Sequence, residues 1–212
     1  MSIQTLLADF AHDRRLTRNE ALGLVGLDSL DDLAPLLRAA SARRDFAHGD
    51  QVSYSRKVFI PLTQLCRDVC HYCTFAHPPR KGERAFLTRE EVLAIAEAGK
   101  KAGCKEALFT LGDKPELRYK AARDELAALG HETTISYLVE VAELVLKETG
   151  LLPHANPGLL TDADLDALRQ VSISQGIMVE STSERLCAKG GAHYGSPDKL
   201  PAARLDTIRR AG

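Results

Sequence analysis

The sequence lacks the features that would place the chain in a membrane or on nucleic acid. No apolar run reaches the roughly 18 residues that a membrane-spanning helix needs, and the start, MSIQTLLADFAHDRR, lacks a signal-peptide pattern. The formal net charge is -1, and no basic stripe with interleaved aromatic residues offers an electrostatic footprint for nucleic acid. We therefore expect a cytoplasmic protein that contacts no nucleic acid and no membrane.

Strand and helix patterns alternate from about residue 57, and this alternation predicts an α/β fold. Each short apolar run is followed by an amphipathic segment, and capping residues such as Thr88 and Thr161 mark helix starts. Right-handed crossovers join such units into one parallel sheet with the helices outside. We predict a partial parallel (β/α) barrel of about four units. The expected strands are VFIPL (58–62), EALFTL (106–111), LLPHA (151–155) and ISQGIMVE (173–180), and 112–130 is expected to form one helix.

The first 50 residues carry helix signals only. Thr17 and Glu20 have capping-box spacing, and Ser29 precedes a second helix that runs towards Gly49. With 212 residues, of which 44% are hydrophobic and 27% charged, the chain has an ordinary globular composition. We predict two parts: an N-terminal helical cap in 1–50, which covers one end of the barrel or acts as a lid or partner contact, and a core domain in 51–212.

Five cysteines, an odd number, argue against a disulfide framework, and three of them lie within eight residues. Cys66, Cys70 and Cys73 are spaced CxxxCxxC with no fourth cysteine nearby. Soft thiolates suit iron–sulfur clusters, and three of them would hold three irons of a 4Fe-4S cluster while the fourth iron stays open. The alternative is a structural zinc site completed by His71 or His77. Cys104 and Cys187, which stand apart, are interpreted as small buried hydrophobic residues.

Four phrases carry a resemblance to a known family: VFIPLTQLCRDVCHYCTFA, AGCKEALFTLGDKPE, ETGLLPHANPG and KGGAHYGSPDK. A cysteine loop that leaves a first strand, with Tyr72 before the last cysteine, resembles the radical S-adenosylmethionine (SAM) superfamily. Within it, the stretch from Lys57 to about Gly212 is similar to the 7,8-didemethyl-8-hydroxy-5-deazariboflavin (FO) synthase family. The resemblance implies that SAM chelates the open iron and that an electron from the cluster, supplied by a reducing donor, yields a 5′-deoxyadenosyl radical.

Active groups in a parallel barrel lie at the carboxyl ends of strands, and the resemblance assigns roles to several residues there. It implies that Tyr72 lies beside the adenine of SAM and that Glu180 hydrogen-bonds SAM. Gly112 and Asp113 stand where the superfamily usually has a Gly-Gly-Glu motif that receives the SAM amino group. His193, in a glycine-rich loop, is the candidate for proton transfer. The alternative for Asp113 is a helix N-cap in a strand-to-helix turn. The alternative for His193 is a solvated side chain in a flexible connector.

The implied reaction is that of a lyase of deazaflavin biosynthesis. The substrate is 5-amino-5-(4-hydroxybenzyl)-6-(D-ribitylimino)-5,6-dihydrouracil, which cyclises through a radical with loss of ammonia. A partner radical SAM synthase, fused in some relatives, makes this substrate from tyrosine and an aminouracil. The rival predictions are that the chain is that partner synthase or a non-catalytic zinc-stabilised module. Because superfamily cores usually have six units, we also expect that the chain is truncated after the fourth.

Overall fold

The structure is a computed structural model that describes residues 15–212, and the chain divides after Tyr54 into two compact units. In the first unit, helix α2 (Arg18–Gly23) starts at a capping box and α3 (Leu30–His48) starts where the Ser29 side chain accepts from a backbone N–H. Both helices follow the sequence prediction. Residues 1–14 of the predicted cap lie outside the described part, and the role of the cap stays a prediction.

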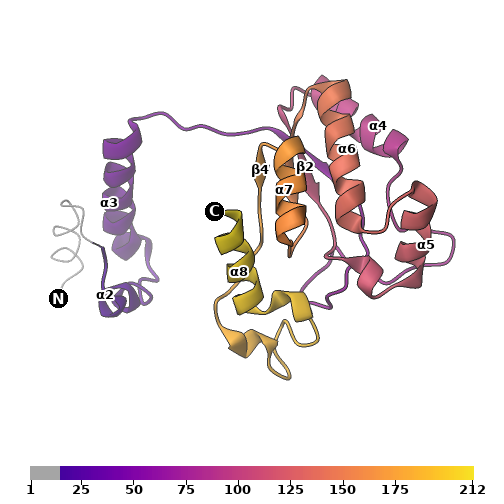
Figure 1. Cartoon of the computed structure of the whole chain (residues 1–212). Helices are drawn as coiled ribbons and strands as arrows, with labels where there is room; N and C mark the ends of the chain where they lie inside the picture. Colours follow the sequence, from indigo (N-terminus) through magenta and orange to yellow (C-terminus); the bar gives the residue numbers. More distant parts are fainter. Residues whose placement is uncertain (1–14) are drawn as a thin grey trace. The chain divides into compact units, whose positions relative to one another are not determined.

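The second unit, 55–212, is built on a parallel sheet whose strands follow chain order (Figure 1). One row of the register runs from Phe59 through Leu108 and His154 to Ser174. The loops that leave the strands therefore emerge at one edge, as expected for a partial parallel barrel. The α/β prediction is confirmed. The strands are β1 (Lys57–Ile60), β2 (Glu106–Thr110), β3 (Leu152–Asn156) and β4 (Ser174–Gln175).

Helices connect the strands and pack beside one another against the sheet. Figure 1 shows α6 and α7 side by side in front of the strands, with α8 next to α7. Capping boxes at Thr88 and Thr161 start two of them, and Gly130 and Gly150 end two others with positive φ angles. The helices are α4 (Arg89–Lys101), α5 (Lys120–Leu129), α6 (Thr134–Thr149), α7 (Asp162–Val171) and α8 (Pro201–Ala211).

The hydrophobic core lies between the sheet and the helices. Phe109 of β2 and Ala155 of β3 are fully buried, as are Val141 and Val145 of α6. Burying side chains of this size contributes about 1.5–3 kcal/mol each for valine or phenylalanine, so this layer holds the strand ends in fixed positions. Gly99 allows α4 to approach β1 closely, because a Cβ there would lie 2.4 Å from the Val58 Cβ.

Two elements differ from the sequence prediction. Strand β4 has two residues, because its partner β3 ends at Asn156 and leaves the following segment, through Glu180, without a neighbouring strand. The helix expected over 112–130 is broken into a 3-10 turn, η2 (Pro115–Leu117), and α5. The Glu116 carboxylate accepts from the backbone N–H and hydroxyl of Thr134, which fixes η2 against the start of α6.

Within residues 15–212, no helix combines the length and apolar character needed to cross a membrane.

Candidate active site

The three clustered cysteines follow β1 and line one cavity of about 300 Å³. Their thiols are free, and Cys66 and Cys70 are partly buried whereas Cys73 is exposed. Two of the sulfurs accept backbone hydrogen bonds: Cys66 Sγ from the Asp113 N–H (3.2 Å) and Cys73 Sγ from the Ala76 N–H (3.4 Å). Sulfur atoms that ligate iron are commonly stabilised by such donors.

The cavity collects residues from every strand end of the sheet. Four of the residues that the resemblance assigned to SAM are among them: Tyr72, Gly112, Asp113 and Glu180. The sequence placed these residues on separate loops, and the parallel order of the strands brings them together. The cavity is also lined by Asp68, Phe75, Ala76, Thr110, Leu111, Asn156, Gly158, Met178, Lys199 and Arg204.

Two glycines allow the β2 loop to approach its neighbours. A Cβ on Gly112 would lie 1.8 Å from the Leu65 carbonyl oxygen, so only glycine lets this loop contact the segment that enters the cysteine loop. Gly158 has φ +93°, and a Cβ there would lie 2.0 Å from Asp113 Oδ2. The Asp113 side chain accepts from the Leu159 N–H (3.3 Å), and it caps no helix, because the residue before η2 is Lys114 and lacks a side-chain cap.

Asp113 is the most perturbed carboxylic acid at the cavity. Burial raises its pKa to about 7, against the opposing attraction of Lys114 and Arg204. One oxygen, Oδ2, accepts from Arg204 at 3.0 Å, whereas Oδ1 lies 3.9 Å from Lys114 Nζ and has no hydrogen-bond partner among the described residues. A buried acceptor without a partner is costly, so Oδ1 is suited to a donor on a ligand.

Arg204 lies in the middle of three buried carboxylates. Its Nε donates to the Asp198 carbonyl oxygen (2.7 Å), and its guanidinium lies 3.9 Å from Asp68 Oδ2. The sequence analysis missed this residue. Its signal was the helical spacing of Pro201, Arg204 and Thr207, which all face inward on α8. An arginine on the buried stripe of an amphipathic helix indicates a paired charge rather than a solvated one.

Tyr72 joins the cysteine loop to the loop after β4. Its hydroxyl lies 3.0 Å from His193 Nε2, and His193 is only 3% exposed. Burial lowers the pKa of His193, which favours the neutral imidazole. The alternative of a solvated histidine is therefore wrong, although His193 does not itself line the cavity and reaches it through Tyr72.

Glu180 occupies the left-handed region with φ +65°, uncommon for a residue other than glycine. Its carboxylate pairs with Lys199 Nζ at 2.9 Å, and this hydrogen bond lowers the pKa of Glu180. Glu180 therefore stays anionic and faces the cavity. His154, by contrast, lies within β3, bonds the Ser174 hydroxyl at 2.5 Å and does not line the cavity.

The spacing of the sulfurs tests which metal group the loop fits. A single zinc ion with Zn–S bonds of about 2.3 Å holds its sulfurs within ~4 Å of one another. In residues 15–212, the one set of three potential ligands gathered within 4.8 Å is Asp68, Asp113 and Asp198, around Arg204, so the cysteine sulfurs are spread more widely. Burial raises the pKa of the Cys66 thiol to about 11, so a bound metal is needed to hold it as a thiolate. Thiolates that bind separate irons of a cluster fit this arrangement.

Comparisons with known proteins agree with this geometry. The model of the radical SAM superfamily matches residues 60–211. The FO synthase of Mycobacterium tuberculosis is 48% identical over 197 residues, which cover 86% of this chain and 23% of the relative. The FO synthase of Nocardia farcinica is 51% identical over 192 residues, which cover 86% of this chain and 22% of the relative. The 7,8-didemethyl-8-hydroxy-5-deazariboflavin synthase of Methanopyrus kandleri is 47% identical over 161 residues, which cover 76% of this chain and 48% of the relative.

The chain thus spans less than a quarter of the FO synthases and about half of the Methanopyrus protein. Among solved structures, methylornithine synthase (PylB) superposes with a TM-score of 0.73 at 25% identity, covering 97% of this chain and 55% of that one. The hydrogenase maturase HydG from Carboxydothermus hydrogenoformans superposes with a TM-score of 0.77 at 21% identity, covering 99% of this chain and 45% of that one. These likenesses concern the fold.

Proposed function

The chain belongs to the radical SAM superfamily, and from this premise we propose that it carries the cluster and SAM site of an FO synthase. The family implies a 4Fe-4S cluster and SAM. The observation that supports the proposal is the cavity lined by the three cysteines and by Asp113, one of whose oxygens accepts no hydrogen bond from the described residues. Identity of 47% and more to relatives with this activity in their names supports the choice of reaction.

In this proposal Cys66, Cys70 and Cys73 hold three irons and leave the fourth open. With both cofactors bound, the site supplies a 5′-deoxyadenosyl radical that abstracts an unactivated hydrogen. The protein holds the irons through a loop whose sulfurs already receive hydrogen bonds. Its contribution is to bind, orient and exclude water, as is general for enzymes whose cofactors carry the difficult chemistry.

The side chains around the cavity suit the charged groups of SAM. Asp113 Oδ1 would accept from the ammonium group, and the nearby positive charge would keep Asp113 ionised in spite of its raised pKa. The Arg204 guanidinium, which also lines the cavity, would attract the carboxylate group. Glu180 would accept hydrogen bonds from SAM, and the Tyr72 ring would pack beside the adenine.

The substrate in this proposal is 5-amino-5-(4-hydroxybenzyl)-6-(D-ribitylimino)-5,6-dihydrouracil. Hydrogen abstraction is followed by ring closure and loss of ammonia, which makes the enzyme a lyase. A partner radical SAM synthase supplies the substrate, and a reducing donor supplies the electron. His193 would exchange a proton with the Tyr72 hydroxyl, because the neutral imidazole and the phenol are already hydrogen-bonded.

The test begins with electron paramagnetic resonance of the anaerobically reconstituted and reduced chain, before and after SAM is added. We expect a 4Fe-4S signal that shifts with SAM. Alanine at Cys66, Cys70 or Cys73 should abolish the signal, whereas alanine at Cys104 or Cys187 should leave it intact. One zinc per chain without sulfide would instead establish the zinc-stabilised module and reject the proposal.

A second experiment separates the two synthases. Conversion of the 4-hydroxybenzyl adduct to FO supports the proposed reaction. Formation of that adduct from tyrosine and the ribityl-aminouracil would assign the chain to the partner synthase instead.

A further inference from the structure

Hydrogen-bond donors lie next to each of the three cysteine sulfurs. The donors to Cys66 and Cys73 are backbone N–H groups, which only a change to proline would remove. The group next to Cys70 is different: the hydroxyl oxygen of Ser196 lies 3.6 Å from Cys70 Sγ. Ser196 thus offers a side-chain donor to Cys70, and it comes from a segment more than a hundred residues further along the chain.

Ser196 is itself buried, and the segment around it contacts the cysteine loop at several points. It is 4% exposed, and its own N–H donates to the His193 carbonyl oxygen (3.0 Å). On one side of it, His71 N–H donates to Ala192 O (2.9 Å), and on the other, Asp198 N–H donates to Asp68 Oδ1 (3.1 Å). These contacts fix the position of the Ser196 hydroxyl relative to the sulfur.

The direction of the hydrogen bond follows from ligation. Val69 N–H donates to Ser196 Oγ at 3.0 Å, so the oxygen already acts as an acceptor and its own proton remains to be donated. A free Cys70 thiol and Ser196 could each be the donor. A thiolate bound to iron has no proton, and the Ser196 hydroxyl must then donate to Cys70 Sγ.

We propose that Ser196 is a positioning residue that orients the Cys70 thiolate and raises the reduction potential of the cluster. A donor to a ligand sulfur offsets negative charge, and the reduced cluster carries one more negative charge than the oxidised one. The hydrogen bond therefore stabilises the reduced state more strongly. This inference rests on the cluster of the proposed function and adds a residue that tunes it.

The test is a redox titration of the reconstituted full chain, followed by electron paramagnetic resonance. In Ser196→Ala, we expect the ratio of reduced to oxidised cluster at a fixed applied potential to fall roughly fivefold, a negative shift of ~40 mV for a one-electron couple. Ser196→Thr keeps the hydroxyl and should restore the wild-type potential. Ser183→Ala, an exposed serine before the 3-10 turn η3 (Glu184–Cys187), is the matched control and should change nothing.

Each outcome decides the matter. Equal potentials in wild type and Ser196→Ala would overturn the inference and leave the proposed function intact, whereas a wild-type chain that takes up no iron and sulfide would reject the proposed function itself. If Ser196→Ala binds no cluster, the thermal unfolding midpoints of the cluster-free wild type and variant are compared. An unchanged midpoint places the loss at Cys70 and supports the inference, and a lowered midpoint shows a general packing role and overturns it.

Discussion

Arg204 and Asp113 form an ion pair at the cavity in which both side chains are almost completely buried, with 3.0 Å between Arg204 Nη2 and Asp113 Oδ2. The pair joins α8 to the loop after β2, two segments 91 residues apart. It therefore ties the last described helix to the carboxylate proposed to receive SAM. Asp68 Oδ2 lies 3.9 Å from the same guanidinium, so its charge offsets more than one anion.

Replacing Arg204 by methionine should destabilise the chain severely. The change removes the guanidinium that pairs with buried Asp113 and Asp68, and breaking a buried pair from one side costs about 3–5 kcal/mol. The measurement is the free energy of unfolding in denaturant. Arg209→Met, an exposed position on the same helix, is the control and should change it by less than about 0.5 kcal/mol. Equal stability of the two variants would show that the pair contributes little.

Gly112→Ala should prevent cluster uptake while the rest of the fold forms. The new Cβ would lie 1.8 Å from a backbone oxygen of Leu65, and backbone cannot move aside as the end of a flexible side chain can. The cysteine loop would have to shift relative to Asp113, whose N–H bonds Cys66. Iron and sulfide content after reconstitution measures the effect. Gly26→Ala, where a Cβ meets nothing within 4 Å, serves as control, and full cluster content in Gly112→Ala would contradict the prediction.

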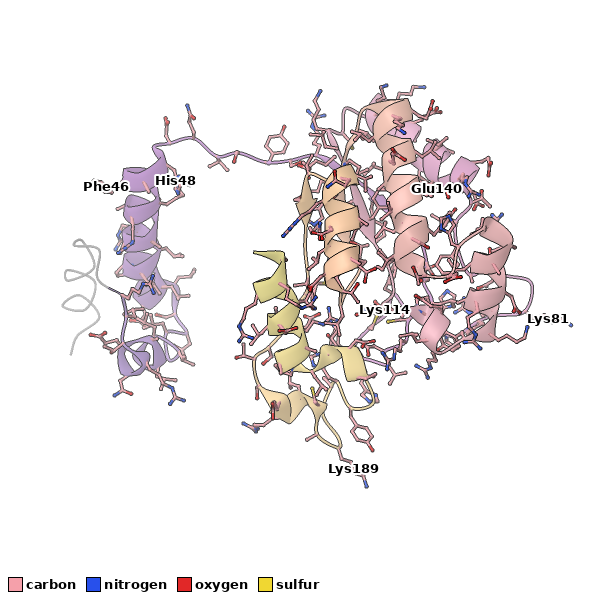
Figure 2. The ribbon with its side chains drawn as sticks, viewed as in Figure 1. Phe46, His48, Lys81, Lys114, Glu140 and Lys189 are labelled. Atoms are coloured by element: carbon pink, nitrogen blue, oxygen red, sulfur yellow. The ribbon has the colours of Figure 1, made fainter. Side chains whose placement is uncertain are left out.

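The network around Glu140 should make stability depend on pH at the acid end. Glu140 lies on the side of α6 that faces α4 and α5 (Figure 2), where it pairs with Arg89 and His131. The Arg89 hydrogen bonds chiefly lower the pKa of Glu140 below its ordinary value of 4.5. A lowered folded pKa stabilises the fold above about pH 4.5, and the contribution is lost as the pH falls through the folded value.

Glu140→Gln should therefore lower the free energy of unfolding at pH 7 by about 1 kcal/mol, because the carboxylate is partly exposed and solvent screens the pair. The difference from wild type should shrink as the pH falls from 7 to 3. Urea unfolding at both pH values measures it. Glu143→Gln, whose exposed carboxylate pairs with Lys147 one turn on, should show a smaller difference at pH 7. A difference for Glu140→Gln that is equal at both pH values would show that charge is not its cause.

Local signals in the sequence predicted where helices and strands form. Features that depend on tertiary contacts, such as the length of a strand, were not predicted. Thr88 and Thr161 start their helices as predicted because a capping box is complete within four residues. Strand β4 is shorter than its apolar run, because its length depends on where β3 ends. No local pattern of residues 173–180 carries that information.

The same distinction applies to the site. Cys66, Cys70 and Cys73 were found because their spacing is local, and Asp113 because its loop follows a clear strand. Arg204 was missed because its burial depends on where α8 packs. His193 was expected in a glycine-rich loop, but its burial follows from the packing of 192–198 on the cysteine loop.

Substitutions at Tyr72 should separate the ring from the hydroxyl. Tyr72→Phe keeps the ring that we propose packs beside adenine, and it removes the hydroxyl that bonds His193 and Glu180. We expect the SAM-induced shift of the cluster signal to persist at unchanged SAM concentration, while formation of FO from the adduct falls by about 10²-fold or more, as loss of an acid–base group does. His193→Gln should lower FO formation in the same way.

Tyr72→Ala removes both ring and hydroxyl, so it should also weaken SAM binding and require more SAM for the same shift. Titration of the cluster signal with SAM, beside assays of FO formation, distinguishes the three variants. If Tyr72→Phe and Tyr72→Ala weaken SAM binding equally, then the hydroxyl and not the ring makes the contact with SAM. If Tyr72→Phe and His193→Gln leave FO formation unchanged, then another group in the cavity transfers the proton. The carboxylic acids that line the cavity are Asp68, Asp113 and Glu180.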